Sequence, residues 1–254
     1  MLKFENLTFS YDDNIVLNNI TTKISAGKIT TILGANGSGK STLLNILSKN
    51  LKVNNGKIFL EGNDINQISS KSYAKKVAMV HQKNHVPNGL TVERLVSYGR
   101  LPFASVLRYK LNEYNQSYVD RAIKLADLEN IRYREIGTLS GGQRQRAFIA
   151  MALAQNTKYL FLDEPTTFLD VKYQIDILKL IKRLNVEENI TILMVLHDIN
   201  QATSYSDEVI GIKDGRVLFK GEAKKVIDER SIHALYGAKL PVYIIGGKLC
   251  VMAV

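Results

Sequence analysis

One segment of this chain, residues 34–41, restricts the fold more than any other. Its sequence, GANGSGKS, fits the pattern G-x-x-x-x-G-K-[S/T]. A strand-like apolar run (29–33) precedes it, and a helical pattern (41–48) follows it. Glycines let the backbone curl so that several N–H groups converge on phosphate oxygens, and the start of the helix adds partial positive charge there. The segment predicts a phosphate-binding loop that joins a strand to a helix.

The residue types within this loop predict how a nucleotide would be held. Lys40 is expected to reach the β- and γ-phosphates, Ser41 to bind Mg²⁺ through its hydroxyl, and Thr42 to reach the α-phosphate. A glycine-rich turn that matches the pattern by chance is the alternative, and the flanking strand and helix argue against it. The other residues expected to contact the nucleotide are Gly34, Asn36, Gly37, Ser38 and Gly39.

A second apolar run, residues 159–162, ends in two carboxylates, Asp163 and Glu164. Ligands of α/β sheets bind at the carboxyl ends of the strands. We expect Asp163 to hold Mg²⁺ through a water molecule and Glu164 to polarise the water that attacks the phosphate. A solvated turn is the alternative, and the phosphate-binding loop elsewhere in the chain makes it the weaker interpretation.

The order of the remaining patterns predicts the fold class. Short strand patterns occupy residues 2–9, 15–24, 28–33 and 56–61, and further strands are expected at 77–80, 191–196, 208–213 and 216–220. Residues 84–156 lack strand signals and show helical periodicity, and an amphipathic helix over 172–185 places Ile175, Leu178, Ile181 and Leu184 on one face. Strands that alternate with helices indicate an α/β core with parallel strands, interrupted by a helical insert.

A third motif, residues 139–143 (LSGGQ), opens another predicted helix. Packing does not require two glycines at a helix start, whereas close approach of an anion does. LSGGQ lies between the phosphate-binding loop and the strand that ends in Asp163 and Glu164, and in this order the motifs resemble the ATPase subunit of an ABC transporter. The resemblance covers residues 11–236 and implies a P-loop NTPase (RecA-like) α/β core with an N-terminal antiparallel β subdomain and an inserted α-helical subdomain. It implies one ATPase domain over 1–254, with the helical subdomain at about 84–156 and a short tail at about 222–254.

The resemblance assigns roles to further residues. Tyr11 is similar to the aromatic residue that stacks on adenine, and Gln82 to the glutamine that senses Mg²⁺ and the partner subunit. Asp170 lies in a loop that resembles the one crossing the dimer interface, and His197 is similar to the histidine that contacts the γ-phosphate. The sequence departs from the common pattern at Ala35, where proline is frequent, and we expect no loss of function from this small residue.

In this family two subunits close head to tail around two ATP molecules. The resemblance therefore implies a homodimer in which each nucleotide meets the loop of one copy and Ser140, Gly141, Gly142 and Gln143 of the other. Hydrolysis, with Glu164 as the base and with Lys40 and Mg²⁺ offsetting charge, is expected to open the dimer and drive a membrane permease. The helical insert and the segment after Gln82 are the expected docking surface for that permease. A single ATPase unit without membrane spans indicates an importer with separately encoded subunits, and the resemblance implies a substrate-binding protein in the same complex.

Residues 90–102, which include Gly99, Arg100 and Pro102, resemble the ATPases of iron-siderophore, haem and vitamin B12 importers, and we expect partner contacts there. A helix that ends at glycine and is followed by proline is the alternative interpretation of this piece. Import of zinc, manganese or an amino acid stays open. An ABC ATPase that acts on nucleic acid is less favoured, because neither a second ATPase unit nor a long coiled-coil insertion is present.

Charge and composition bear on location. The formal net charge of +10 suits a polyanionic partner, and we attribute the excess over nucleotide binding to an anionic membrane face, without specific binding of nucleic acid. Cys250 is the single cysteine, which fits a reducing compartment, and apolar runs are strand-sized. The expected location is the cytoplasmic face of the plasma membrane, as a peripheral protein.

Overall fold

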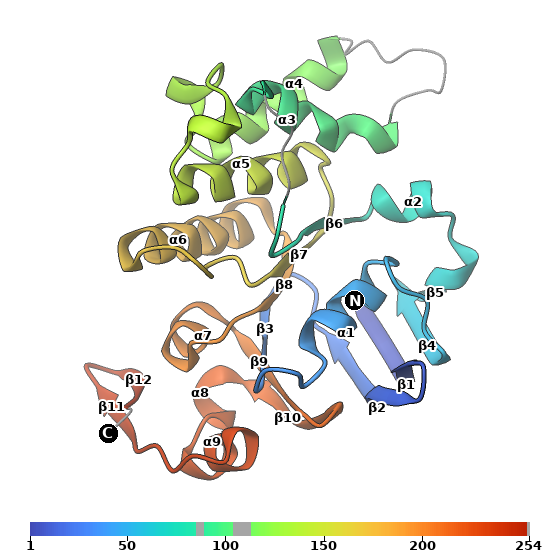
Figure 1. The fold of residues 1–254 in the computed structure, drawn as a ribbon, viewed down its shortest axis with the longest axis vertical. Coiled ribbons are helices and arrows are strands. Elements are labelled where there is room, and N and C mark those ends of the chain that lie inside the picture. Colours follow the sequence, from blue (N-terminus) through green and yellow to red (C-terminus); the bar gives the residue numbers. More distant parts are fainter. Residues whose placement is uncertain (85–88, 104–112, 253–254) are drawn as a thin grey trace. The chain divides into compact units, whose positions relative to one another are not determined.

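The computed structural model describes residues 1–84, 89–103 and 113–252 (Figure 1). The chain divides into two compact units, one formed by Met1–Ile68 with Thr191–Val254 and the other by Ser69–Ile190. The helical segment expected over 84–156 lies within the second unit. Residues 85–88 and 104–112 of this segment lie outside the described residues, and its boundaries remain a prediction. In the described part of the chain, no helix combines the length and the apolar character needed to span a bilayer.

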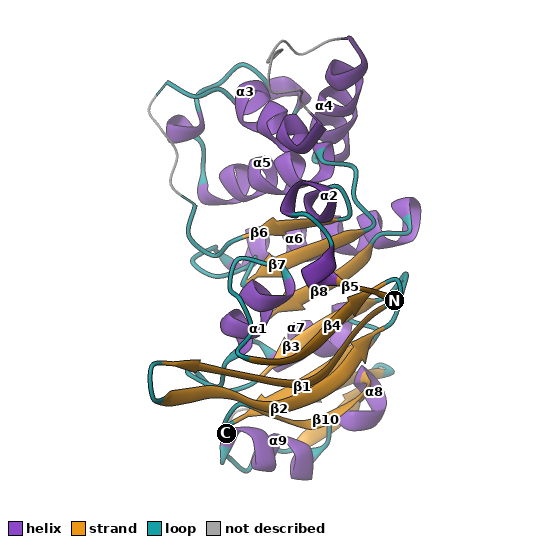
Figure 2. Cartoon of the chain, turned by 90° about the vertical axis from the view of Figure 1, so that its right-hand side faces the viewer, coloured by secondary structure: helices purple, strands orange, loops and turns teal. Residues whose placement is uncertain are grey.

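The first unit begins with an antiparallel sheet, as predicted (Figure 2). Its strands are β1 (Leu2–Tyr11), β2 (Asn14–Ile24), β4 (Asn55–Leu60) and β5 (Asn63–Asp64), in the order β2-β1-β4-β5. Leu2 and Phe4 are buried on one face, and a register shift then brings Leu7 to the same side. Asn6 lies in this irregularity with a φ of 52°. The strand pattern was visible in the sequence, whereas this bulge was not.

The same unit contains a second set of strands, which carries the phosphate-binding loop. β3 (Ile29–Leu33) is parallel to both β8 (Thr191–Val195) and β9 (Glu208–Lys213), and β10 (Arg216–Glu222) is antiparallel to β9. Every residue of β3 and β8 is buried, as expected for parallel strands covered on both faces. The other elements of the unit are η1 (Ile65–Gln67), α1 (Lys40–Leu47), α7 (Ile199–Tyr205), α8 (Ala223–Val226), α9 (Glu229–Tyr236), β11 (Val242–Ile245) and β12 (Lys248–Val251).

The second unit contains the parallel pair β6 (Val77–Val80) and β7 (Tyr159–Asp163). Its helices are α2 (Ser70–Ala74), α3 (Val92–Ser97), α4 (Glu113–Leu125), α5 (Gly141–Ala154) and α6 (Val171–Glu188), with short 3-10 turns η2 (Tyr98–Phe103), η3 (Glu129–Ile131) and η4 (Ile136–Thr138). Helices α3 and α4 both pack on α5 (Figure 1). In α6, Leu178, Ile181 and Leu184 are fully buried, but Ile175 is 39% exposed, so its predicted place on the buried face is wrong.

Gly99 and Arg100 fasten η2 to the end of α5. A Cβ on Gly99 would lie 2.0 Å from the carbonyl oxygen of Met151, so only glycine permits this approach. The guanidinium of Arg100 donates to the carbonyl of Ala154 (2.8 Å) and, through Nε, to Asn115 (3.0 Å). It also lies 3.9 Å from the centre of the Phe103 ring. Arg100 is only 3% exposed, so its charge is enclosed within its own unit, and the partner contacts expected over residues 90–102 stay a prediction.

Candidate phosphate-binding and catalytic site

The first glycine of the phosphate-binding loop, Gly34, is fixed by close contacts. A Cβ added to it would lie 2.2 Å from the carbonyl oxygen of Ile212 and 2.6 Å from Ser38 Oγ. Gly34 therefore has to lack a side chain, because the loop turns directly against the backbone of β9.

The last glycine of the loop, Gly39, is constrained by both conformation and space. Its φ is 95°, a value that favours glycine, and it caps the start of α1. A Cβ there would lie 2.8 Å from the carbonyl oxygen of Val16 and 2.7 Å from Leu17 Cδ2. Strand β2 thus supports one end of the loop and β9 the other, and neither support was predicted from the motif.

The side chains of Lys40 and Ser38 turn into the loop. Lys40 is 5% exposed, and its ammonium group donates to the carbonyl oxygens of Gly34 (2.9 Å) and Ala35 (2.7 Å). Ser38 Oγ is buried and has no hydrogen-bond partner among the described residues. A buried cation beside an unsatisfied hydroxyl, at the start of a helix, is the arrangement that a phosphate group would complete.

The rest of the loop leaves room for a ligand. Asn36 and Gly37 are exposed, and no atom lies within 4 Å of a Cβ built on Gly37. Ser41 and Thr42, in the first turn of α1, are partly exposed. Ala35 contributes its carbonyl to Lys40 while its side chain is exposed, so the loop makes no use of the methyl group.

In the second unit, Glu164 follows β7 and lies beside Gln82, which follows β6. Gln82 Nε2 donates a short hydrogen bond to Glu164 Oε2. Thr167 Oγ1 donates to the same oxygen at 3.0 Å. The backbone of Glu164 has a φ of 49°, an uncommon conformation for a non-glycine residue that is often found at functional sites. The structure therefore holds this carboxylate in place from two sides.

Sequence reasoning paired neither Gln82 nor Thr167 with Glu164. For the loop that contains Asp170, the resemblance predicts only that it crosses the dimer interface. A hydroxyl three residues after the carboxylate is a weak local signal that could have suggested Thr167, since side chains with this spacing often meet across a turn. The contact of Gln82 has no such signal, because it depends on the parallel pairing of β6 with β7.

The LSGGQ motif forms the start of α5. Ser140 accepts from the N–H of Gln143 (3.3 Å), and Gln143 Oε1 accepts from the N–H of Ser140 (3.1 Å), which is a capping box. In a helix the first N–H groups have no partner within the helix, so the two that this box does not use belong to Gly141 and Gly142.

Packing does explain one of these glycines, contrary to the expectation from the sequence. A Cβ on Gly142 would lie 2.7 Å from Cδ1 of Tyr173, a residue of α6. Gly141 is exposed, and a Cβ on it would meet only the end of the Leu169 side chain at 3.1 Å. Gly142 therefore lets α5 approach α6, while Gly141 leaves the helix start open to solvent.

The remaining predicted residues are placed as follows. Tyr11 is 51% exposed at the end of β1, and its ring stands edge-on to Phe9 with 4.8 Å between the ring centres. His197 is exposed directly after β8, and Asp198 caps α7 by accepting from the N–H of Gln201 (2.9 Å). Asp170 is exposed at the start of α6.

Ser41, Gln82 and Asp163 supply a hydroxyl, an amide and a carboxylate, the hard oxygen donors that Mg²⁺ prefers. Asp163 ends β7 and is 6% exposed. Nowhere in the described ranges do three or more His, Cys, Asp or Glu side chains gather in a way that could hold a metal ion.

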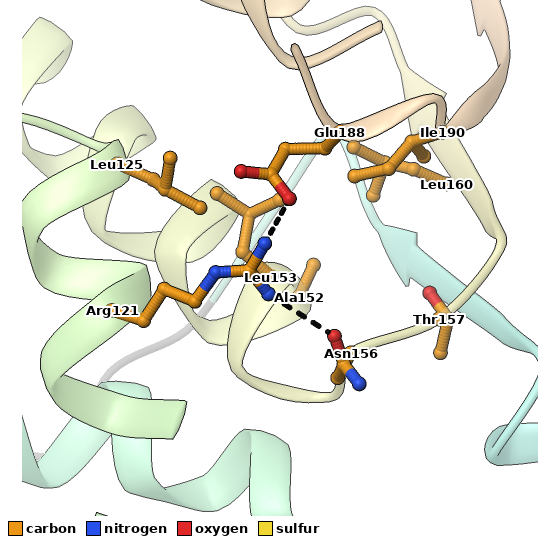
Figure 3. A pocket seen from close by; sticks show the side chains of 9 residues that line it. All are labelled: Arg121, Leu125, Ala152, Leu153, Asn156, Thr157, Leu160, Glu188 and Ile190. Atoms are coloured by element: carbon orange, nitrogen blue, oxygen red, sulfur yellow. Dashed lines mark hydrogen bonds and ion pairs between the residues drawn. The ribbon is translucent and has the colours of Figure 1, made fainter. Parts of the chain in front are cut away.

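A cavity of about 230 Å³ lies elsewhere in the second unit (Figure 3). Arg121 crosses it, forming an ion pair with Glu188 and a 3.4 Å hydrogen bond with Asn156. Glu188 already neutralises the guanidinium, so the cavity offers no free charge to an anion, and none of the motif residues lines it. Its lining consists of Arg121, Leu125, Ala152, Leu153, Asn156, Thr157, Leu160, Glu188 and Ile190.

Comparison with known proteins agrees with this geometry. Residues 17–167 match the family model described as ABC transporter. The chain is 40% identical to the petrobactin import ATP-binding protein YclP of Bacillus subtilis (strain 168), with 96% of each protein covered. It is 43% identical to the iron(3+)-hydroxamate import ATP-binding protein FhuC of the same organism, over 89% of this chain and 84% of the relative.

The fold also matches solved structures of this kind. The dimeric ATP-binding cassette MJ0796, in a post-hydrolysis state with ADP and Pi, superimposes with a TM-score of 0.74 at 32% identity, covering 88% of this chain and 99% of that one. The family match spans the phosphate-binding loop, the LSGGQ helix and the strand that ends in Asp163. This chain therefore belongs to the ABC transporter family and corresponds to its ATPase domain.

Proposed function

We propose that this protein binds and hydrolyses ATP as the energising subunit of an ABC importer for an iron-siderophore complex. The observation that carries the proposal is the loop between β3 and α1, where Lys40 is buried beside the unsatisfied hydroxyl of Ser38. Burying the Ser38 hydroxyl without a partner costs stability, whereas a phosphate group could accept a hydrogen bond from it beside the Lys40 ammonium. The loop is therefore built for a ligand with that chemistry.

The residues of the loop bind and orient the triphosphate. Lys40 offsets negative charge on the β- and γ-phosphates, and the backbone N–H groups around Gly37 and Gly39 donate to their oxygens. Thr42 reaches the α-phosphate, and the half-exposed ring of Tyr11 stacks on the adenine. Mg²⁺, when bound through Ser41, Gln82 and Asp163, would withdraw electron density from the phosphate oxygens.

Glu164 accepts the proton of the attacking water. The hydrogen bonds from Gln82 and Thr167 to Oε2 fix the direction of the carboxylate towards that water. His197 donates to the γ-phosphate as the bond to the β-phosphate breaks.

A second copy of the chain completes each site. The N–H groups of Gly141 and Gly142, which the Ser140–Gln143 capping box leaves without partners, donate to the γ-phosphate held by the other copy. The exposed Asp170 crosses the same homodimer interface. Hydrolysis removes the γ-phosphate that ties the copies together, and their separation drives separate permease subunits, which work with a substrate-binding protein.

The cargo and the location are proposed from the relatives. Petrobactin import and iron(3+)-hydroxamate import are the roles given in the names of the two relatives above, at 40% and 43% identity. We therefore favour a ferric siderophore over zinc, manganese or an amino acid, and a transport role over action on nucleic acid. The protein would lie at the cytoplasmic face of the plasma membrane, where its net charge of +10 favours anionic lipid.

The catalytic part of the proposal is tested with Glu164→Gln. The amide keeps the shape of the side chain but cannot accept the proton of water, so turnover should fall by at least about 100-fold while MgATP still binds. Steady-state ATPase assays and gel filtration with MgATP would be expected to show an inactive, ATP-bound dimer. Hydrolysis at the wild-type rate would remove Glu164 from the role of base.

The cargo is tested in cells that lack the gene for this protein. Uptake of radioactive iron bound to a hydroxamate or to petrobactin should be lost and should return with the wild-type chain, but not with Glu164→Gln. Zinc, manganese and amino-acid uptake serve as parallel measurements. Normal iron uptake in the deleted strain, with loss of one of the others, would contradict the assignment to siderophores.

A further inference from the structure

The carboxyl-terminal tail contacts the elements that carry the phosphate-binding loop and His197, all within the first unit. Helix α9 begins at a capping box between Asp228 and Ser231 and ends at Gly237, whose φ is 74°. Ile232 and Leu235 are buried, and Lys213 of β9 donates to the carbonyl of Ala234 at 2.6 Å. These contacts fix the last residue of the helix, Tyr236, at a defined place.

The rest of the tail is attached to α7, the helix that follows His197. The side chain of Asn200 accepts from the N–H of Val251 (2.7 Å) and donates to the carbonyl of the same residue (3.0 Å). Strand β12 therefore lies along α7, as Figure 1 shows. The tail thus contacts β9, which lies against the phosphate-binding loop, and α7, which follows His197.

The hydroxyl of Tyr236 is buried against this region. Its oxygen has no hydrogen bond of ordinary geometry to any described residue. Burial raises the pKa of the phenol to about 12, the N–H of Gly34 lowers it, and the charge of Asp198 raises it. The phenol is therefore a neutral hydroxyl that faces the first residue of the loop and the residue after His197.

A buried hydroxyl without a partner is costly, whereas a phenylalanine in its place would carry no such cost. The unsatisfied oxygens of Tyr236 and Ser38 both lie next to Gly34. The Gly34 N–H therefore lies close to the phenol without forming a hydrogen bond of ordinary geometry to it.

We infer that Tyr236 is a positioning residue for nucleotide binding: its hydroxyl accepts from Gly34 when the loop closes on phosphate, and so couples the tail to the occupied site. The inference rests on the proposed function, since it needs a nucleotide in the loop. It concerns binding and not the chemical step, because Tyr236 touches the loop backbone and not the reacting atoms.

Tyr236→Phe tests this inference in the full-length chain, with Tyr243→Phe as the matched control. Tyr243 loses the same hydroxyl from a half-exposed position on β11. In Tyr236→Phe we expect the Kd for MgADP and the KM for ATP to rise about fivefold, equivalent to about 1 kcal/mol and typical of one neutral hydrogen bond. The kcat should stay within about twofold of wild type, because only binding changes.

Melting temperatures separate this role from a structural one. Without nucleotide, Tyr236→Phe should melt at or above the wild-type temperature, because a buried unsatisfied group has been removed, while saturating MgADP should stabilise it less than it stabilises the wild type. Wild-type affinity in Tyr236→Phe would overturn the inference, as would a large fall in its melting temperature without nucleotide. Failure of the wild-type chain itself to bind MgADP or hydrolyse ATP would instead overturn the proposed function, and the inference with it.

Discussion

Glu164 Oε2 accepts hydrogen bonds from Gln82 and from Thr167, so the second of these can be removed without touching the carboxylate itself. In Thr167→Val the side chain keeps its shape but loses the donor. The carboxylate would then sample more orientations, and we expect kcat to fall about three- to tenfold with little change in KM, since one neutral hydrogen bond is involved. Steady-state ATPase kinetics measure both constants.

The control for this prediction is Thr138→Val in the same unit. The hydroxyl of Thr138 donates to the carbonyl of Glu135 (2.8 Å) and is exposed, so its loss should leave kcat unchanged. An equal fall in both variants would point to a general loss of structure. A wild-type kcat in Thr167→Val would mean that the hydrogen bond from Thr167 is not needed to orient Glu164.

How far single residues could be predicted depends on where their partners lie. The pattern places Lys40 in the loop, and its ammonium group contacts the carbonyl oxygens of two residues of the same loop, Gly34 and Ala35, while its contact with phosphate stays a prediction. The partner of Gly142, Tyr173, lies in the next helix, so its packing role was missed. Tyr236 was missed for the same reason: nothing near it in sequence shows that it meets Gly34.

Arg100 is the residue of η2 whose guanidinium binds the end of α5. Removing a buried guanidinium leaves the Ala154 carbonyl and Asn115 without their donor and opens a gap beside the Phe103 ring. We expect Arg100→Ala to lower the free energy of unfolding by about 3 kcal/mol, the scale found when a buried, hydrogen-bonded charge is truncated. Chemical denaturation of the purified chain measures this loss.

Two further variants show whether the loss of stability is specific to the guanidinium of Arg100. Leu101→Ala changes a neighbouring side chain that is 48% exposed, and its stability should stay within about 0.5 kcal/mol of wild type. Arg100→Lys should not restore stability, because an ammonium group cannot stack flat on the Phe103 ring and donate to Ala154 and Asn115 at the same time. A stable Arg100→Ala chain with impaired transport would contradict this structural role and favour a partner contact at Arg100.

Strands and helices were predicted best where the pattern of apolar residues in the sequence reflects burial. The strands predicted over 28–33 and 191–196 are found at Ile29–Leu33 and Thr191–Val195, and both lie in the core, where each strand is covered on both faces. Helix α6 was found in its correct place, but Ile175 lies off the buried face. Ile177 is buried instead, because the surface that α6 covers depends on its neighbours and not on its own period alone.

For the whole molecule, the sequence predicts a helical insert over about 84–156, and these bounds stay a prediction; the compact unit that contains this segment runs over Ser69–Ile190 and includes β6, β7 and α6. Hydrophobic periodicity shows the type of each element, but it does not show which elements pack into one body. The other unit is built from both ends of the chain, so the loop after β3 and the tail that reaches it are far apart in sequence and close in space.

Charge decides how two whole molecules approach each other. Each copy carries a formal charge of +10, and bound MgATP removes only about two of these charges, so two copies repel each other when they close. Salt screens such repulsion, with a Debye length of about 10 Å at 0.1 M and about 3 Å at 1 M. With saturating MgATP, the dimer fraction of Glu164→Gln should therefore rise as salt increases from about 0.05 to about 0.3 M, a range over which this length shortens.

Light scattering at fixed protein concentration measures that fraction, and Lys40→Ala in the Glu164→Gln background is the control. Without Lys40 the nucleotide contacts are weakened, so no salt should restore the dimer. If salt instead dissociates the dimer, the copies are held together by attraction between opposite charges. The prediction that bound nucleotide joins two copies whose positive charges repel each other would then be contradicted. Nucleic-acid binding has the opposite dependence on salt, because it releases counterions as it forms. The sign of the salt effect thus also separates dimerisation from incidental binding of nucleic acid by a basic surface.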